Sequence, residues 1–270
     1  MIDRENEQLP LAGRKTEDVP GHWLLARLGK RVLRPGGLDL TRELLLHARL
    51  KGQDVVELAP GLGRTAAMII AARPSSYVGV DEDKDAAAIV DKVVSGHGYC
   101  RTANASETGL PEACADVVIG EAMLTMQGTK TKQAIIAEVV RLLRPGGRYA
   151  IHELGLQPDD LDEQIDTEIR QALARTIKVN ARPLTAASWC ELLETHGLVV
   201  EWTGTADMAL LKPRRNIADE GLLGTARIVR NLLRDAQARK RVLAMRKVFT
   251  THRKSLTGIA LVAYKPAARH

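Results

Sequence analysis

Short apolar runs alternate with amphipathic stretches between residues 54 and 153, and this alternation constrains the fold more than any other feature of the chain. The apolar runs cover residues 54–58, 77–80, 99–103, 116–119 and 148–153. The stretches between them have helical spacing, most clearly at residues 131–143, after which Pro145 and two glycines follow. Strands that alternate with helices are joined by right-handed crossovers into a parallel sheet. The sequence therefore predicts an α/β fold.

The regions on either side of this alternation follow a different pattern. Two short helices are predicted before it, at residues 23–33 and 39–48. After it we predict helices at residues 159–179 and 186–195, a strand at 198–203, a mostly helical and basic stretch at 220–250, and a last strand at 256–264. The two late strands would extend the sheet at one edge.

A ligand site is predicted where the first strand turns into the helix that follows it. Small residues stand at positions 59, 61 and 63, so the backbone there can approach a ligand closely. Ligands of such folds bind at the carboxyl edge of the sheet. Residues 61–66 also fit the GxGxxA pattern, and Asp81 lies 18 residues after Gly63. A nicotinamide-dependent oxidoreductase is therefore one interpretation of this segment.

Polar residues at the strand ends favour another cofactor. Glu57 ends the first strand, where its carboxylate can accept hydrogen bonds from an amino-acid moiety. Asp81 ends the second strand and is placed to accept two hydroxyl donors of a ribose. After the third strand, Asn104 and Ala105 supply an amide and a backbone N–H that can bind the edge of an adenine.

These residues, in this order, resemble the Rossmann-like (class I) S-adenosylmethionine-dependent methyltransferases, and especially the small-molecule branch that includes the ubiquinone/menaquinone C-methylases. The resemblance covers about residues 52–156 and includes the Arg-Leu-Leu-Arg-Pro-Gly-Gly run at 141–147. Two departures stand in the first motif: Ala59 replaces a glycine, and Pro60 removes an N–H. A third is Asn104, where the family often has an aspartate.

The resemblance implies S-adenosyl-L-methionine as cofactor and S-adenosyl-L-homocysteine as product. It implies a Rossmann-like, seven-stranded, mostly parallel sheet with helices on both faces, an N-terminal helical cap and helical insertions near the C-terminus. We divide the chain into the cap, residues 1–49, and a methyltransferase domain, residues 50–270, whose cofactor-binding half is 50–156 and whose substrate-side half with lid helices is 157–270. The implied cofactor-binding residues are Glu57, Ala59, Gly61, Gly63, Asp81, Glu82, Asn104, Ala105 and Glu121.

The chemistry implied by the family needs little from the protein beyond alignment. A sulfonium methyl is already activated, and aligning two reactants can lower a barrier by about 7–11 kcal/mol. A general base is needed where the nucleophile arrives protonated. The candidates are Glu121, after the fourth strand, and His152, in the fifth. Glu121 also fits a substrate-binding or helix-capping role, and His152 fits a satisfied buried imidazole.

The segment after the fourth strand argues for a small-molecule substrate. Residues 120–124 read Gly-Glu-Ala-Met-Leu and lack the Asn/Asp-Pro-Pro-aromatic and Pro-Cys motifs of related nucleic-acid methylases. Aromatic residues make up 3% of the chain, which leaves little for base stacking. Residues 212–270 nevertheless hold fifteen Lys and Arg against three acids. An RNA or protein methyltransferase that docks through this basic region is therefore the alternative.

Other features of the sequence bear on the cellular location, metal content and oligomeric state of the protein. The sequence has no run of 18 apolar residues, so we expect no membrane-spanning helix. Residues 1–15 lack the apolar core of a secretory signal. The three cysteines, at positions 100, 114 and 190, are too widely spaced for a zinc cluster. We expect a cytoplasmic, metal-free protein, and a homo-oligomer is compatible with the sequence.

Overall fold

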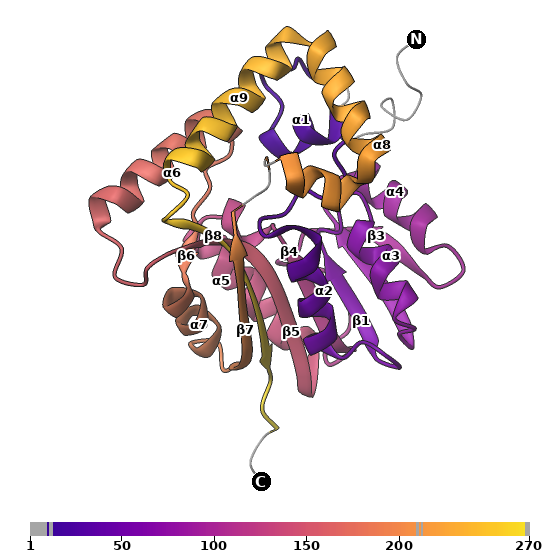
Figure 1. The fold of residues 1–270 in the computed structure, drawn as a ribbon. Coiled ribbons are helices and arrows are strands. Elements are labelled where there is room, and N and C mark those ends of the chain that lie inside the picture. Colours follow the sequence, from indigo (N-terminus) through magenta and orange to yellow (C-terminus); the bar gives the residue numbers. More distant parts are fainter. Residues whose placement is uncertain (1–9, 11–12, 209–210, 212, 268–270) are drawn as a thin grey trace.

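The computed structural model describes residues 10, 13–208, 211 and 213–267, which form one mixed sheet with helices on both faces (Figure 1). The strands follow the order β3-β2-β1-β4-β5-β8-β7, and the two-residue strand β6 pairs with the end of β5. Their bounds are β1 Asp54–Leu58, β2 Ser76–Asp81, β3 Gly98–Thr102, β4 Ala115–Glu121, β5 Leu143–Leu156, β6 Leu184–Thr185, β7 Val199–Asp207 and β8 Leu256–Tyr264. Strands β1 to β5 pair in parallel, whereas β8 is antiparallel to both β5 and β7. The predicted Rossmann-like, mostly parallel sheet is confirmed.

The helices cover both faces of this sheet and one of its edges. They are α1 Gly21–Arg27, α2 Gly37–Ala48, α3 Arg64–Ala71, α4 Lys84–Val94, α5 Thr129–Leu142, α6 Glu163–Ile177, α7 Ala186–Glu194, α8 Pro213–Arg234 and α9 Ala236–Thr251, with a 3-10 turn η1 at Leu124–Met126. Helices α2, α3 and α4 pack on one face, and α5 and α7 pack on the other.

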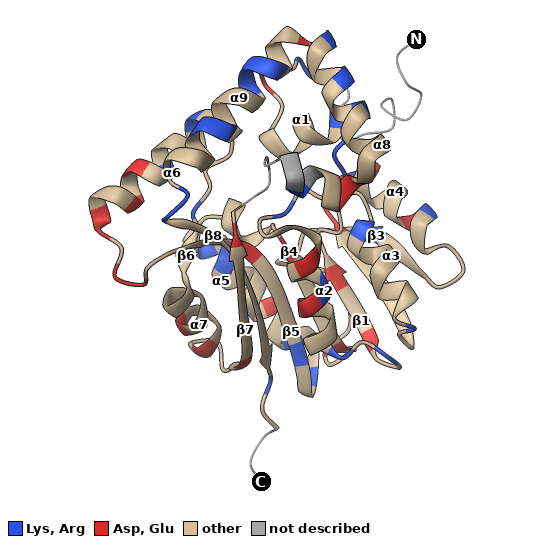
Figure 2. Cartoon of the chain, viewed as in Figure 1, with Lys and Arg blue, Asp and Glu red and all other residues tan. Residues whose placement is uncertain are grey.

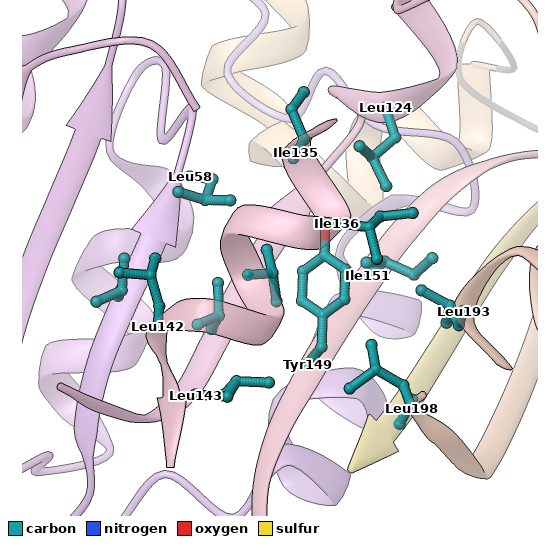
Figure 3. Close-up of a cluster of buried hydrophobic side chains, with 14 of the residues drawn as sticks. Leu58, Leu124, Ile135, Ile136, Leu142, Leu143, Tyr149, Ile151, Leu193 and Leu198 are labelled. Atoms are coloured by element: carbon teal, nitrogen blue, oxygen red, sulfur yellow. The ribbon is translucent and has the colours of Figure 1, made fainter. Parts of the chain in front are cut away.

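The core follows from the period-two alternation of strand side chains. Val117 and Ile119 of β4 face the α2–α4 layer, and Val118 between them faces α5. Figure 3 shows the hydrophobic cluster on the α5 and α7 side of the sheet, in which Tyr149 of β5 packs with side chains of these two helices. Because both faces are buried, the strands read as nearly continuous apolar runs rather than as alternating ones.

The end of α1 differs from the prediction. We expected a helix over residues 23–33, but α1 ends at Arg27 because Gly29 takes a left-handed φ of 100°. The Gly29 N–H donates to Ala26 O (2.9 Å) and the Lys30 N–H to Leu25 O (3.0 Å), which is a Schellman motif. Residues 30–36 therefore form a loop that ends in a turn before α2.

Strand β5 is longer than predicted at both ends. It begins at Leu143, directly after α5, although we expected its start at Arg148. The ladder with β4 shifts register between Ala115 and Val117, so Pro145 and the two glycines are accommodated as an irregularity in the strand. The basic stretch forms two helices, because Asp235 caps α9 by accepting from the Ala238 N–H at 2.8 Å.

Three helices lie over the carboxyl edge of the sheet, and we call α1, α6 and α9 the roof (Figure 1). Their apolar side chains pack together with those of Leu154, Leu156 and Leu256 from the sheet. The predicted helical cap and C-terminal insertions are thus present. The domain boundary at residue 49 stays a prediction, and residues 1–9 and 11–12 of the predicted cap lie outside the described residues.

Candidate functional site

A cavity of about 630 Å³ lies between the roof and the carboxyl edge of the sheet. Its lower wall comes from the ends of β1, β2, β3 and β4, and its upper wall from the roof helices. Eight of the nine predicted cofactor residues line it: Glu57, Ala59, Gly61, Asp81, Glu82, Asn104, Ala105 and Glu121. Parallel strands bring these residues together because their carboxyl ends meet at one edge.

The turn after β1 carries three small residues with positive φ at alternate positions. Ala59, Gly61 and Gly63 have φ values of 50°, 59° and 70°. A Cβ on Gly61 would have no neighbour closer than Ala59 O at 4.0 Å, whereas one on Gly63 would meet Val93 Cγ2 at 3.1 Å. Gly63 does not line the cavity. Its role in this structure is to let α3 and α4 pack closely.

Asp81 is held in place by the backbone around it. Its carboxylate accepts hydrogen bonds from the Gly61 N–H (3.1 Å) and the Asp83 N–H (3.0 Å). Burial raises the pKa of Asp81, and these two hydrogen bonds oppose the rise. A carboxylate has about four acceptor positions, so two hydroxyl groups can still bind. Glu82, the next residue, is exposed at the cavity rim.

Asn104 and Ala105 form the part of the wall that follows β3. The Asn104 Oδ1 atom accepts from the Ser106 N–H (2.9 Å) and the Ser106 hydroxyl (2.7 Å). Its Nδ2 atom lies 3.5 Å from Glu82 Oε2. The side-chain oxygen that the sequence suggested for an adenine edge is therefore already engaged, and the amide nitrogen is the more available end.

Glu57 is a buried carboxyl group that faces the cavity. It accepts a hydrogen bond from the Tyr77 hydroxyl at 2.7 Å. Burial raises the pKa of Glu57 to about 8, although the Tyr77 hydrogen bond opposes the rise. Without a cation beside it, the group is mostly protonated at neutral pH. A ligand ammonium at this point would favour its ionised form.

Glu121 is the centre of a buried network. Its carboxylate accepts from Arg34 Nη1 (2.7 Å), from the Thr41 hydroxyl (2.7 Å) and from the Thr65 hydroxyl. Burial alone would raise the pKa of Glu121, but the Arg34 charge and the hydrogen bonds from His152 and Thr41 lower it to about 2. A carboxylate with this pKa and these partners is a weak base.

His152 lies behind Glu121 and is fully buried. Its Nδ1 atom is 2.9 Å from Glu121 Oε1, and its Nε2 atom contacts Pro35 O. It does not line the cavity. The geometry thus brings the two candidate bases together as one structural unit and gives His152 no access to a ligand.

The resemblance implied a cap and lid helices, but the sequence did not predict which of their side chains together form the upper wall. His22 and Trp23 of α1 line the cavity, with ring centroids 5.0 Å apart. Burial lowers the pKa of His22 to about 4, so its imidazole is unprotonated at neutral pH. The roof also contributes apolar side chains: Leu25, Leu173, Ile177, Met245 and Phe249. These contacts join segments that are far apart in the chain and leave no local sequence signal.

Glu153, next to His152, has a structural explanation. Its carboxylate accepts from the N–H groups of Met123 (3.0 Å), Leu124 (2.8 Å) and Thr125 (3.0 Å) and from the Thr125 hydroxyl. It therefore holds the segment that leads into η1. Burial raises the pKa of Glu153, and these hydrogen bonds oppose the rise.

Three further properties concern the described residues as a whole. Within them, no group of three or more His, Cys, Asp or Glu side chains is arranged to hold a metal ion. Cys100, Cys114 and Cys190 are free and partly buried rather than fully buried. No helix in the described ranges is long and apolar enough to cross a membrane.

Comparison with known proteins identifies the family. Residues 56–151 match the family model described as a methyltransferase domain. An uncharacterised Haemophilus influenzae protein is 32% identical over 255 residues, which cover 92% of this chain and 99% of that protein. A Mycolicibacterium smegmatis protein, provisionally named as an S-adenosylmethionine-dependent methyltransferase, is 30% identical over 207 residues, or 72% of this chain and 67% of that protein.

The fold is also found among solved structures. Haemonchus contortus phosphoethanolamine N-methyltransferase 2, in complex with phosphomonomethylethanolamine and S-adenosylhomocysteine, superposes with a TM-score of 0.67 at 15% identity. The match covers 92% of this chain and 57% of that one. The nicotinamide-dependent alternative left open by the sequence is therefore set aside. The chain belongs to the S-adenosylmethionine-dependent methyltransferases.

Proposed function

We propose that the protein methylates a small, largely apolar molecule, as the small-molecule branch with the ubiquinone/menaquinone C-methylases does. The shape of the cavity carries this proposal. Its polar part, from Glu57 to Asn104, continues directly into a chamber lined by Ile177, Met245 and Phe249. Mostly apolar walls with a few placed polar groups are typical of sites for small molecules.

The polar part of the cavity suits S-adenosyl-L-methionine. We assign Glu57 to the ammonium of its amino-acid moiety, because it is a buried carboxyl group that faces the cavity and accepts its hydrogen bond from a neutral hydroxyl. We assign Asp81 to the ribose hydroxyls, because its backbone contacts fix the carboxylate at the end of β2. We assign Ala105 and the Asn104 amide, which line the cavity after β3, to the edge of the adenine.

The residues of the chain then mainly align the two reactants. The bound cofactor supplies an activated methyl group, and the roof excludes water from the acceptor. We assign Glu121 and His152 as positioning residues, because the hydrogen bonds of Glu121 are directed to Arg34, Thr41 and Thr65. Where the acceptor arrives protonated, the unprotonated imidazole of His22, which lines the chamber, can accept a hydrogen bond from it, although a pKa of about 4 makes it a weak base.

The cofactor assignment is tested by calorimetric titration with S-adenosyl-L-homocysteine, with NAD as control. We expect micromolar binding of the first ligand alone and its loss in Asp81→Ala. Asp91→Ala, at an exposed acid of α4 outside the cavity, is the matched control and should bind normally. Failure of the wild-type protein to bind the ligand would contradict the assignment.

The substrate class is tested with methyl-labelled S-adenosyl-L-methionine and a cell extract separated into small-molecule, RNA and protein fractions. We expect the label in the small-molecule fraction, extractable into organic solvent. Label transferred to RNA or protein would support the alternative in which the basic C-terminal region docks a macromolecule. Transfer of the label to a polar small molecule would contradict the proposal that the methyl acceptor is apolar.

A further inference from the structure

The outward side of α8 exposes large apolar side chains that the cavity does not use. Leu222, Leu223 and Leu233 are 74%, 89% and 69% exposed, and Val229 is 49% exposed. Leu222, Ala226, Val229 and Leu233 follow one another at intervals of four, three and four residues, so they form one stripe along the helix. A contiguous exposed apolar stripe indicates an interaction surface.

A basic stripe runs beside the apolar one. Arg227, Arg230 and Arg234 repeat the same spacing one residue further along, and all three are exposed. The opposite side of the helix is fixed to the protein, because Ile228 is buried and the Asn231 amide donates to Leu28 O at 3.2 Å. The two stripes therefore face solvent in a defined orientation.

Helix α9 also exposes a leucine together with basic residues. Its outward side carries Leu243, 56% exposed, among the exposed basic residues Arg239, Lys240, Arg246 and Lys247. Figure 2 shows Lys and Arg recurring along α8 and α9. Residues 222–254 hold ten Lys and Arg, and their single acid is Asp235. We call the exposed residues of α8 from Leu222 onward and of α9 the basic–leucine face.

We propose that the basic–leucine face docks on an anionic membrane surface. Helices that lie in a lipid interface combine leucines, which enter the headgroup and acyl boundary, with Lys and Arg, which bind anionic lipids. Both are present here on the same pair of helices, with the leucines next to the arginines. The charge of the face is complementary to such a surface.

Other occupants match the face less well. Two copies of this face would bring their arginines together, and like charges repel. Nucleic acid would pair with the basic residues but not with the exposed leucines, and residues 222–247 contain no aromatic side chain for base stacking. A lipid surface uses both stripes.

The inward side of α9 gives this surface a consequence for the cavity. Met245 and Phe249 line the chamber from the same helix that exposes Leu243. Docking would therefore place the roof against the lipid phase, in which an apolar acceptor dissolves. This consequence for the acceptor rests on the proposed function, whereas the docking surface itself is independent of methyl transfer.

The test is co-sedimentation of the full chain with vesicles of phosphatidylcholine alone or mixed with phosphatidylglycerol, without cofactor. We expect binding to the mixed vesicles, weak binding to phosphatidylcholine, and loss of binding at high salt. Leu222→Gln with Leu233→Gln should lower the partition coefficient at least about tenfold. Arg234→Gln, Lys240→Gln and Lys247→Gln should each lower it about fivefold. Glutamine preserves helix propensity.

Matched controls come from other surfaces of the molecule. Leu46→Gln changes a leucine of α2 that is 75% exposed, and Lys92→Gln changes an exposed lysine of α4; both should bind like wild type. In addition, Leu233→Trp should tighten binding and shift its fluorescence to the blue in the presence of mixed vesicles.

Three outcomes would overturn the proposal. One is equal binding to both kinds of vesicle, or to neither. Another is a wild-type dimer in solution that the double leucine variant dissociates. The third is tight, salt-sensitive binding of RNA or DNA that the leucine variant retains while vesicles compete poorly. None of these readouts depends on activity, so a failed docking surface and a failed methyltransferase assignment are distinguishable.

Discussion

Arg34 Nη1 lies 2.7 Å from Glu121 Oε2, and this buried ion pair joins the loop after α1 to the end of β4. The side chains are 10% and 7% exposed. Thr41 and Thr65 add hydrogen bonds to the same carboxylate. The pair therefore fixes the N-terminal segment, and with it the wall of the cavity, on the sheet.

Removing Arg34 should be strongly destabilising. Arg34→Met leaves the Glu121 carboxylate buried without its counter-ion, which costs about 3–5 kcal/mol of unfolding free energy. The double variant Arg34→Met, Glu121→Gln should recover part of this loss. Urea unfolding measures both. The control is Arg42→Met, which breaks an exposed ion pair with Asp39 and should cost less than about 1 kcal/mol. An equal loss of unfolding free energy in Arg34→Met and Arg42→Met would refute the role of burial.

Glu57→Gln should stabilise the ligand-free protein at neutral pH. The pKa of Glu57 is raised from 4.5 to about 8, so the folded state holds a proton that the unfolded state has released between these pH values. Stability from this group therefore falls as pH rises from about 4.5 to 8, by up to about 3 kcal/mol at pH 7. In urea unfolding, Glu57→Gln should have a higher free energy of unfolding than wild type at pH 7 and an equal one near pH 4. The same variant should bind S-adenosyl-L-homocysteine more weakly.

Cofactor binding should release a proton in the same pH range. We expect a ligand ammonium beside Glu57 to ionise it, so affinity for S-adenosyl-L-homocysteine should rise from pH 6 towards pH 8. Calorimetry in buffers of different ionisation enthalpy measures the proton count directly. An affinity that is flat over this range in wild type, and equal to that of Glu57→Gln, would rule out the assignment of Glu57 to the ammonium.

Ala59→Gly should improve both stability and cofactor affinity. Ala59 has a φ of 50°, a conformation that glycine adopts without strain, and the gain should be about 0.5–1 kcal/mol after the entropy cost of glycine. Ala113 has a φ of 49° but lies outside the cavity. Ala113→Gly should therefore gain stability without gaining affinity. Thermal unfolding and calorimetry separate the two effects, and an affinity gain in both variants would be unexpected.

Gly61→Ala and Gly63→Ala should fail in different ways. A Cβ on Gly63 meets Val93 and imposes backbone strain, so we expect a loss of about 1–3 kcal/mol in unfolding free energy. A Cβ on Gly61, where the φ of 59° also imposes backbone strain, meets no close neighbour but stands in the cavity wall. We therefore expect the larger loss of S-adenosyl-L-homocysteine affinity in Gly61→Ala. The opposite ranking would place Gly63 at the ligand.

The sheet and the polar half of the site could be predicted because their signals are local. Strands β1 and β2 are mostly buried, largely apolar runs, and Glu57 and Asp81 lie at their carboxyl ends. The end of α1 could also have been read from Gly29. The length of β5 could not, because Pro145 and Gly146 normally interrupt a strand, and here the ladder with β4 absorbs them as a register shift.

The roof helices were predicted, but the buried network and the particular roof side chains that line the cavity could not be, for a different reason. Arg34 and Glu121 are 87 residues apart, and nothing near either residue indicates the other. His152 has the pattern of a catalytic candidate and of a core histidine alike, and only its contact with Glu121 separates the two. Tertiary contacts, rather than local propensity, decide these positions.

The roof also determines the order in which the cavity can be built during folding. Arg241 of α9 donates to Val19 O at 2.9 Å across 222 positions of sequence, whereas the strands of the lower wall pair with neighbours far closer along the chain. Closing so long a loop is entropically costly, and contacts of high sequence separation slow folding. An intermediate with the sheet formed and the roof still open would expose the apolar undersides of α1, α6 and α9. Aggregation during folding is therefore expected to begin at the roof rather than at the sheet.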